Sequence, residues 1–168
     1  MLRAALLDRE LYEEVEADPS ATRQAFAVVL LSAVAAGLGG LEHRGVPSIV
    51  GYTLIALAGW WIWAYVTYVI GTRLLPGPET QADVGQLLRT IGFSSAPGVL
   101  RIFALVPPVG AQVFLASTIW MLIAMVIAVR QALDYASTAR AIAVCAVGFP
   151  IYALILAASM LLLGPWPL

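Results

Sequence analysis

The chain has 168 residues, of which 61% are apolar and 11% are charged, and its mean hydropathy is +0.91. Soluble domains are about half apolar and about a quarter charged, so this composition indicates an integral membrane protein and excludes disordered, collagen-like and disulfide-stapled classes. A net charge of −1 leaves no basic surface for nucleic acid. With one His and one Cys, a zinc site built from these residues is excluded, and we expect no metal or other cofactor.

Residues 1–18 are predicted to form a short amphipathic helix at the membrane interface, because apolar residues recur at helical spacing opposite charged ones. The apolar set is Ala4, Leu7, Leu11 and Val15, and the charged set is Arg9, Glu13 and Glu16. The high acidic content argues against a secretory signal peptide. Residues 19–168 are expected to form a single transmembrane domain whose first helix begins near Pro19.

Long runs without Asp, Glu, Lys or Arg predict the membrane spans, since about 20 helical residues cross a hydrocarbon layer of about 30 Å. The runs are Gln24–Leu41, Gly45–Thr72, Ile102–Val129 and Ala141–Leu168. Pro107 and Pro108 interrupt the third, so its helix should begin near Gly110, and the residues before them join a fifth candidate segment. The predicted spans are about 21–41, 48–71, 87–106, 110–130 and 140–163.

Whether the segment 87–106 crosses the membrane decides the topology. If it crosses, seven arginines lie on the side of the N-terminus, against Arg44 on the other: Arg3, Arg9, Arg23, Arg73, Arg89, Arg130 and Arg140. If it is re-entrant, the split weakens to six against three. The positive-inside rule therefore favours five spans, with the N-terminus cytoplasmic and the C-terminus outside. All nine basic residues are arginine and the chain is rich in alanine, which is typical of a high-GC bacterium and predicts the bacterial inner membrane.

The fifth segment also holds the candidate polar site. An unpaired arginine at the depth of Arg101 would cost at least ~2.5–3.5 kcal/mol, so it should snorkel outward or find an acceptor. Pro97 predicts a kink whose freed backbone groups Ser94 and Ser95 could satisfy. By topology the nearest partners of Arg101 are Glu42 and His43 in the outer loop. Arg101 is thus either a structural residue or part of a polar site in a water-reached cavity.

Small residues four positions apart predict close helix packing within the bundle, or with a second copy of the chain. They are Ala33 with Gly37, Ala36 with Gly40, and Ala141 with Cys145. The second span carries Trp60, Trp61, Trp63, Tyr65 and Tyr68. Because the tryptophans lie near the middle of this span, we expect them to pack inside the bundle or face lipid rather than anchor its ends.

Charged residues at the ends of the spans predict a cytoplasmic rim, which is either a solvated edge or a docking surface for a partner. The rim comprises Arg73, Asp83, Arg89, Arg130, Asp134 and Arg140. Arg130 and Asp134 are four residues apart and are expected to pair on one helix face.

Catalytic chemistry has little to build on in this sequence. His43 is the only imidazole, Cys145 lies within the last span, and no nucleophile-elbow, phosphate-loop or zinc-protease motif is present. We therefore expect no catalytic residues and no enzyme activity.

Several stretches resemble bacterial members of the Yip (Ypt-interacting protein) integral membrane family: the lead LLDRELYEEVEADPSATRQA, the central RTIGFSSAPGVLRIF followed by VPPVG, and IWMLIAMVIAVRQAL. The resemblance covers roughly residues 18–163 and implies five spans with a cytosolic N-terminus. Eukaryotic relatives act in vesicle traffic and associate with Rab-type small GTPases, and they carry a long cytosolic N-terminal region ahead of the bundle. The lead here is short, so small-GTPase binding is not expected to carry over.

The predicted fold is an all-α, polytopic bundle of five transmembrane helices. Its predicted role is that of a non-enzymatic, membrane-organising or partner-binding protein, whose partners are the lipid bilayer and a second copy or another membrane protein. The alternative is a small transporter or channel subunit that uses Arg101 and the helix break at Ser94–Gly98.

Overall fold

The computed structural model describes residues 1–39, 47–106 and 108–163, and every regular element in these ranges is a helix. Four helices are long and apolar enough to cross a membrane, which confirms the predicted all-α bundle. They are α3 (Ala21–Gly39), α5 (Pro47–Val69), α7 (Gly110–Ala132) and α8 (Thr138–Leu163). The predicted partners Glu42 and His43 lie outside the described residues.

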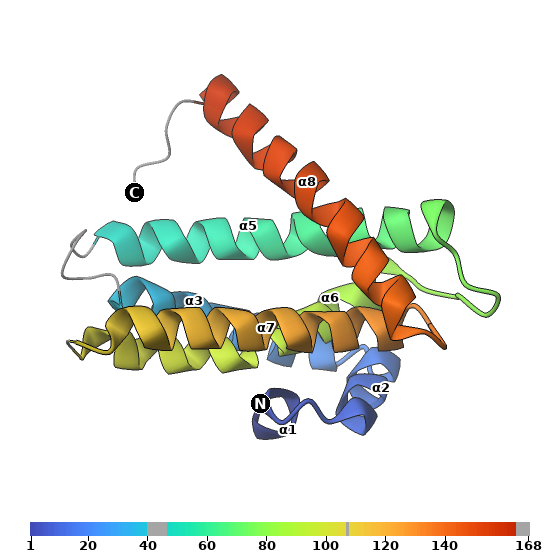
Figure 1. Cartoon of the computed structure of the whole chain (residues 1–168), viewed down its shortest axis with the longest axis horizontal. Helices are drawn as coiled ribbons and strands as arrows, with labels where there is room; N and C mark the ends of the chain where they lie inside the picture. The colour runs from blue at the N-terminus through green and yellow to red at the C-terminus, as the bar shows by residue number, and fades with distance from the viewer. Residues whose placement is uncertain (40–46, 107, 164–168) are drawn as a thin grey trace.

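The fifth predicted span is two shorter helices in series, α6 (Val84–Ser94) and the 3-10 helix η2 (Ala96–Leu105). Both pack between α3 and α7 and run the length of the bundle beside them (Figure 1). With 11 α-helical and 10 3-10 residues, this pair extends about 36 Å, against about 35 Å for the 23 residues of α7. The broken segment is therefore as long as an unbroken span.

The break in this segment is where proline stops the α-helical hydrogen-bond ladder. The Ser95 N–H donates to the Gly92 carbonyl at 3.2 Å, and the chain continues with 3-10 bonds such as Gly98 N–H to Ser95 O at 2.9 Å. Pro97 is fully buried. Gly98 lies so close to both neighbouring helices that an added Cβ would stand 2.0 Å from Ser32 Oγ and 2.8 Å from Met121 Sδ. The break is thus packed into the core.

The amphipathic lead is two helices, α1 (Leu2–Ala5) and α2 (Arg9–Ala17), rather than one. The chain turns at Leu7, whose φ is 62°, and the Asp8 side chain caps α2 by accepting a hydrogen bond from the Glu10 N–H at 3.0 Å. The predicted apolar residues Ala4, Leu11 and Val15 are buried, and Leu7 is half-buried. Tyr12, which the spacing analysis did not include, is also fully buried.

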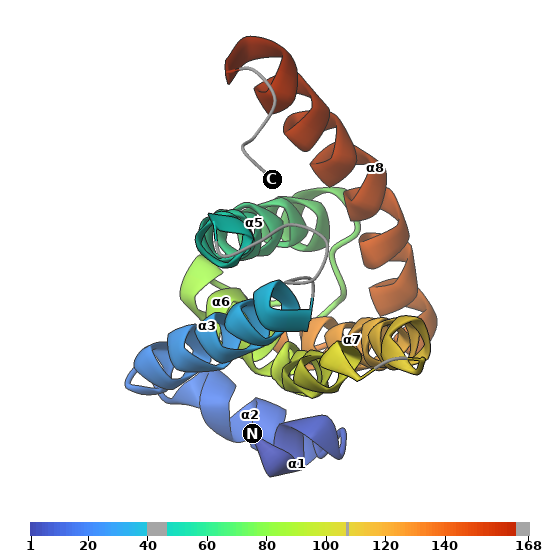
Figure 2. The ribbon, with the colours of Figure 1, turned by 90° about the vertical axis from the view of Figure 1, so that its left-hand side faces the viewer.

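The long helices lie roughly side by side, except that α8 crosses α5 diagonally and leans away from the others (Figures 1 and 2). One end of the bundle, which we call the polar end, contains α2 and residues 74–84 and 132–138. The opposite end contains Gly39, Pro47 and residues 105–106 and 108–110. Gly37 packs against α5 so closely that an added Cβ would meet the Ile49 Cα at 2.8 Å. This small-residue position therefore serves close packing between two helices of the same chain.

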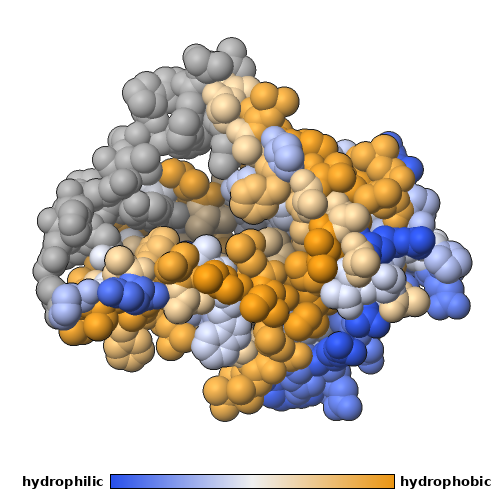
Figure 3. All heavy atoms as spheres, in the orientation of Figure 1, coloured by the Kyte–Doolittle hydropathy of each residue, from blue (hydrophilic) through white to orange (hydrophobic). Residues whose placement is uncertain are grey.

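Large apolar side chains are exposed along the outer faces of α5, α7 and α8, including Leu54, Trp61, Leu115 and Leu154. Hydrophilic residues instead gather over α2 and the polar end, at the lower right of Figure 3. Trp60 and Trp63 are buried while Trp61 and Tyr65 are exposed, so both expected placements of the aromatic residues occur. An apolar belt of this kind suits contact with lipid.

Candidate functional site

A cavity of about 350 Å³ lies within the bundle. Its wall is formed by α3, α5, the α6–η2 pair, α7 and α8. Its polar lining consists of Arg101 and several hydroxyl groups. The apolar lining includes Trp60, Trp63, Met121 and Met125, and two exposed residues, Leu122 and Phe149, also border it. The cavity therefore reaches the apolar outer surface between α7 and α8.

Arg101 reaches across from η2 to α7. Its Nη2 donates to Thr118 Oγ1 at 2.8 Å, its Nε donates to Ser117 Oγ at 3.4 Å, and its guanidinium carbon stands 4.4 Å from the centre of the Phe114 ring. Thr118 is eight residues beyond Gly110, or about 12 Å along α7. The guanidinium thus lies well inside the bundle, and its contacts among the described residues are hydroxyl groups and an aromatic face.

The other predicted residues of the polar site gather around the helix break. Ser94 and Ser95 line the cavity together with Arg101. The Ser94 hydroxyl donates to the Ile91 carbonyl at 2.7 Å, which is the backbone role predicted for it. Pro97 is buried beside the cavity rather than in its wall.

Sequence reasoning missed several residues of this cavity. Ser32 of α3 and Thr118 of α7 are ordinary polar residues of apolar helices, and only their position in space distinguishes them. Trp63 borders the cavity and is 6% exposed, and its Nε1–H is buried without an acceptor in the described part of the chain. The run of tryptophans in the second span was the one sequence feature that could have indicated the position of Trp63 in this cavity. Trp60, by contrast, donates to the Leu88 carbonyl at 2.9 Å.

At the polar end, Arg89 is buried rather than presented on a rim. Its Nε donates to the Val15 carbonyl at 2.8 Å, and its Nη2 donates to the Glu16 carbonyl. These carbonyls belong to the last turn of α2, which has no intrahelical partners for them. Arg89 therefore fixes α2 to α6.

The predicted pairing of Arg130 with Asp134 gives way to a different contact. Arg130 donates to the Tyr135 and Ala136 carbonyls, both at 3.0 Å, and so caps the turn that follows α7. The helix ends at Ala132, and Asp134 has a φ of 52°, so the two side chains no longer share a helix face.

The turn after α7 is also tied to the end of α5, where the π-helix η1 (Ile70–Leu74) leads into the loop. The Tyr135 hydroxyl bonds to the carbonyls of Gly71 and Leu75, and Arg140 donates to the Pro76 carbonyl at 3.3 Å. Arg73 remains exposed, and Asp83 is exposed while it caps α6 in a capping box with Gln86. Three of the four arginines predicted for the rim thus donate to backbone carbonyls, and Asp83 accepts from a backbone N–H.

Acidic side chains line a second cavity of about 310 Å³ at the polar end. They are Glu13, Glu16, Glu79 and Asp134. Burial, together with the charges of Asp134, Glu13 and Asp83, raises the pKa of Glu16 to about 7, although Arg89 opposes the shift. Since four acids and a single arginine, Arg130, line this cavity, negative charge dominates its surface.

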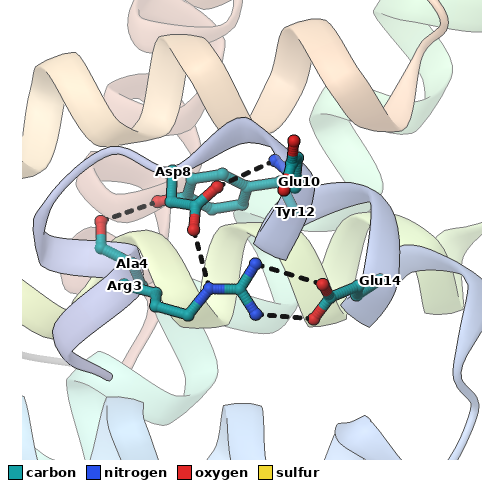
Figure 4. Close-up of polar contacts among 6 residues, drawn as sticks. All are labelled: Arg3, Ala4, Asp8, Glu10, Tyr12 and Glu14. Atoms are coloured by element: carbon teal, nitrogen blue, oxygen red, sulfur yellow. Dashed lines mark hydrogen bonds and ion pairs between the residues drawn. The ribbon is translucent and has the colours of Figure 1, made fainter.

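The turn between α1 and α2 is held by polar contacts (Figure 4). Arg3 pairs with Asp8 at 2.7 Å and with Glu14 at 2.8 Å, and the Tyr12 hydroxyl bonds to the Ala4 carbonyl. Burial raises the pKa of Tyr12 above its usual value. The hairpin also contacts the transmembrane bundle, since the Trp120 indole N–H donates to the Ala5 carbonyl at 2.8 Å.

These features belong to a chain that matches one family model, that of the Yip1 domain, over residues 8–160. The chain belongs to the Yip1 domain family. The matched range begins at the cap of α2 and ends within α8, so the broken segment and both cavities lie inside the Yip1 domain. Comparison with curated proteins and with solved structures finds no match. Yip1 proteins are a non-enzymatic membrane family, which fits the apolar outer surface.

Proposed function

We propose that this Yip1-domain protein is a non-enzymatic, partner-binding protein of the bacterial inner membrane that uses its polar end as the docking surface. The observation that carries this proposal is the division of the surface. Apolar side chains cover the outer faces of the long helices, whereas exposed acids concentrate around α2 and the turn after α7. A surface suited to lipid cannot select a soluble partner, but a charged end can.

The polar end is proposed to face the cytoplasm. The helix termini at this end carry most of the arginines of the described residues, including Arg23, Arg73, Arg130 and Arg140. The α6–η2 pair is as long as the span α7, which supports five crossings and a C-terminus on the other side. The positive-inside rule then assigns the arginine-rich end to the cytoplasm.

Cysteine labelling tests this topology. Two exposed positions can each take a single cysteine in a Cys145→Ser chain. One is Ser137, at the polar end, and the other is Gln112, near the start of α7. A membrane-impermeant reagent added to intact cells should label Gln112→Cys and spare Ser137→Cys. Labelling of Ser137→Cys with protection of Gln112→Cys would contradict the proposed orientation.

The partner is proposed to be a basic segment of another protein, because four acids and a single arginine, Arg130, line the second cavity. Charge of one sign attracts a segment of the other and speeds its association. The binding should therefore weaken steeply as salt is raised.

Site-specific photocrosslinking tests the docking surface. A photoreactive residue replacing Asp134 should capture a discrete partner, and the double substitution Glu13→Lys and Glu79→Lys should abolish that product. The same probe at Gln112 is the matched control at the opposite end and should capture no such product. Equal products from both ends, or a product unaffected by charge reversal, would contradict partner binding at the acidic surface.

A second candidate function is movement of a small solute, and the specific observation that favours it is the cavity beside the helix break. Broken helices form binding sites in transporters. Purified protein in liposomes should then move a solute above the empty-vesicle baseline, and Arg101→Leu should remove that flux while the protein remains folded. Absence of flux above the empty-vesicle baseline would contradict this second function, and flux that persists in the Arg101→Leu protein would contradict a role of Arg101 in it.

A further inference from the structure

We propose that the internal cavity binds a long-chain fatty acid, with its carboxylate on Arg101 and its hydrocarbon chain against the apolar wall. This inference is independent of partner binding at the polar end, because the two sites share no residue.

The charge of Arg101 points to an anionic ligand. In the part of the chain that the structure describes, no carboxylate lies within ion-pair distance of Arg101. The two hydroxyl groups that accept its hydrogen bonds are neutral, and they already donate to the Phe114 carbonyl at 2.9 Å and 2.8 Å. A positive charge in apolar surroundings without a countercharge is costly, so a bound anion would stabilise it.

The geometry of Arg101 leaves donors for that anion. A guanidinium has five N–H donors in a planar fork, and the two bonds to Ser117 and Thr118 use only part of them. A carboxylate matches the fork with two parallel, charge-assisted hydrogen bonds.

The remaining wall of the cavity points to a hydrocarbon chain. Trp60 and Ile91 present apolar surface, and the flexible side chains of Met121 and Met125 adapt to irregular shapes. The volume of about 350 Å³ is at the small end of ligand sites, which hold about 300–1,000 Å³, and it favours one chain over a complete two-chain lipid.

The depth of the charge favours a carboxylate over a phospholipid headgroup. Arg101 is held at the level of Thr118, about 12 Å from the start of α7. Phosphates of bilayer lipids lie outside the hydrocarbon core of about 30 Å, whereas a fatty acid can enter head first. The exposed residues Leu122 and Phe149 mark an entrance from the lipid side.

Photoaffinity labelling of the full-length protein in nanodiscs tests the proposal. Hexadecanoic acid with a diazirine in its chain should form adducts on Met121 or Met125, located by peptide mass spectrometry. Unlabelled hexadecanoic acid should compete with this labelling. Its methyl ester should compete at least tenfold less well, because it cannot form the charge-assisted pair with Arg101. Equal competition by acid and ester would overturn the proposal, as would adducts confined to outward-facing positions.

Varying the phosphatidylglycerol content of the nanodisc distinguishes a fatty-acid site from a phospholipid headgroup site. If the site takes a fatty acid, raising phosphatidylglycerol from zero to half of the lipid should change the labelling less than twofold. Suppression of labelling in proportion to phosphatidylglycerol would identify a phospholipid headgroup site and overturn the fatty-acid assignment.

Variants locate the two halves of the site. Arg101→Gln should weaken labelling at least tenfold, and Arg23→Gln, at an exposed position of α3, is the matched charge-removal control that should leave it unchanged. Ala56→Phe fills the cavity without touching the charge and should also block labelling. Undiminished labelling in either cavity variant would overturn the site. Glu42→Gln should leave labelling intact or raise it, and loss of labelling in this variant would also contradict the proposal.

Discussion

The two arginines of the broken segment meet different environments although only twelve positions separate them. Arg89 is 7% exposed and donates to two backbone carbonyls of α2, which have no other partner within their helix. Arg101 is half-buried and donates to hydroxyl groups that are already bonded to the Phe114 carbonyl. Arg89 is therefore required by its acceptors, whereas the acceptors of Arg101 do not depend on it. The comparison separates an arginine that holds the fold from one that is available for a ligand.

The largest expected effect is that of Arg89→Met. The substitution removes two hydrogen bonds from a charged donor and leaves the Val15 and Glu16 carbonyls buried without partners, so we expect a loss of about 3 kcal/mol of stability. Equilibrium unfolding in mixed micelles measures this loss, and faster proteolysis after Ala17 should accompany it. Arg89→Lys restores one of the two hydrogen bonds, so its stability should lie between that of the unmodified protein and that of Arg89→Met. If Arg89→Met unfolds like the unmodified protein, Arg89 does not hold α2 in place.

Gly98→Ala tests the packing of the helix break between the two arginines. Its Cβ would meet Ser32 Oγ and Met121 Sδ far inside contact distance, so we expect destabilisation of about 1–3 kcal/mol. Gly148→Ala is the matched control, because the nearest atom to its Cβ would be Trp63 Cη2 at 3.3 Å, and it should cost less than about 1 kcal/mol. Equal effects in the same unfolding measurement would show that the break is loosely packed.

Arg101→Met should change stability by less than about 1 kcal/mol in either direction, because an apolar side chain replaces a charge and leaves no orphaned acceptor. The same unfolding assay therefore gives the sharpest contrast with Arg89→Met. A loss as large as that of Arg89→Met would make Arg101 structural and remove the difference between the two environments.

The smallest expected effect is the pH dependence of α2 docking through Glu16, whose pKa is raised to about 7. A raised pKa means that the folded state binds the proton more tightly, so the stabilisation present at low pH is lost as the pH rises from about 4.5 to about 7. Glu16 is half-exposed, and after solvent screening we expect a change of only about 0.5–1 kcal/mol. Protease protection of α2 should decrease from pH 5 to pH 8, and Glu16→Gln should remove that decrease. The opposite slope would contradict burial as the cause.

The amino-acid sequence by itself determined the helices of this protein. Charge-free runs located α3, α5, α7 and α8 to within a few residues, because the length and composition of a span are local properties. The break beside Pro97 was also predictable, since proline acts on its own backbone. Membership of the Yip1 domain family agrees with the resemblance seen in the sequence.

The tertiary structure alone decided what each polar residue contacts. Arg89 and the Val15 carbonyl are 74 positions apart, and the cavity around Arg101 is assembled from five segments. Even the local pairing of Arg130 with Asp134 failed, because the helix ends at Ala132, two residues before Asp134. Spacing along the chain reports neighbours within one helix, whereas partners on different helices depend on packing, which brings distant positions together.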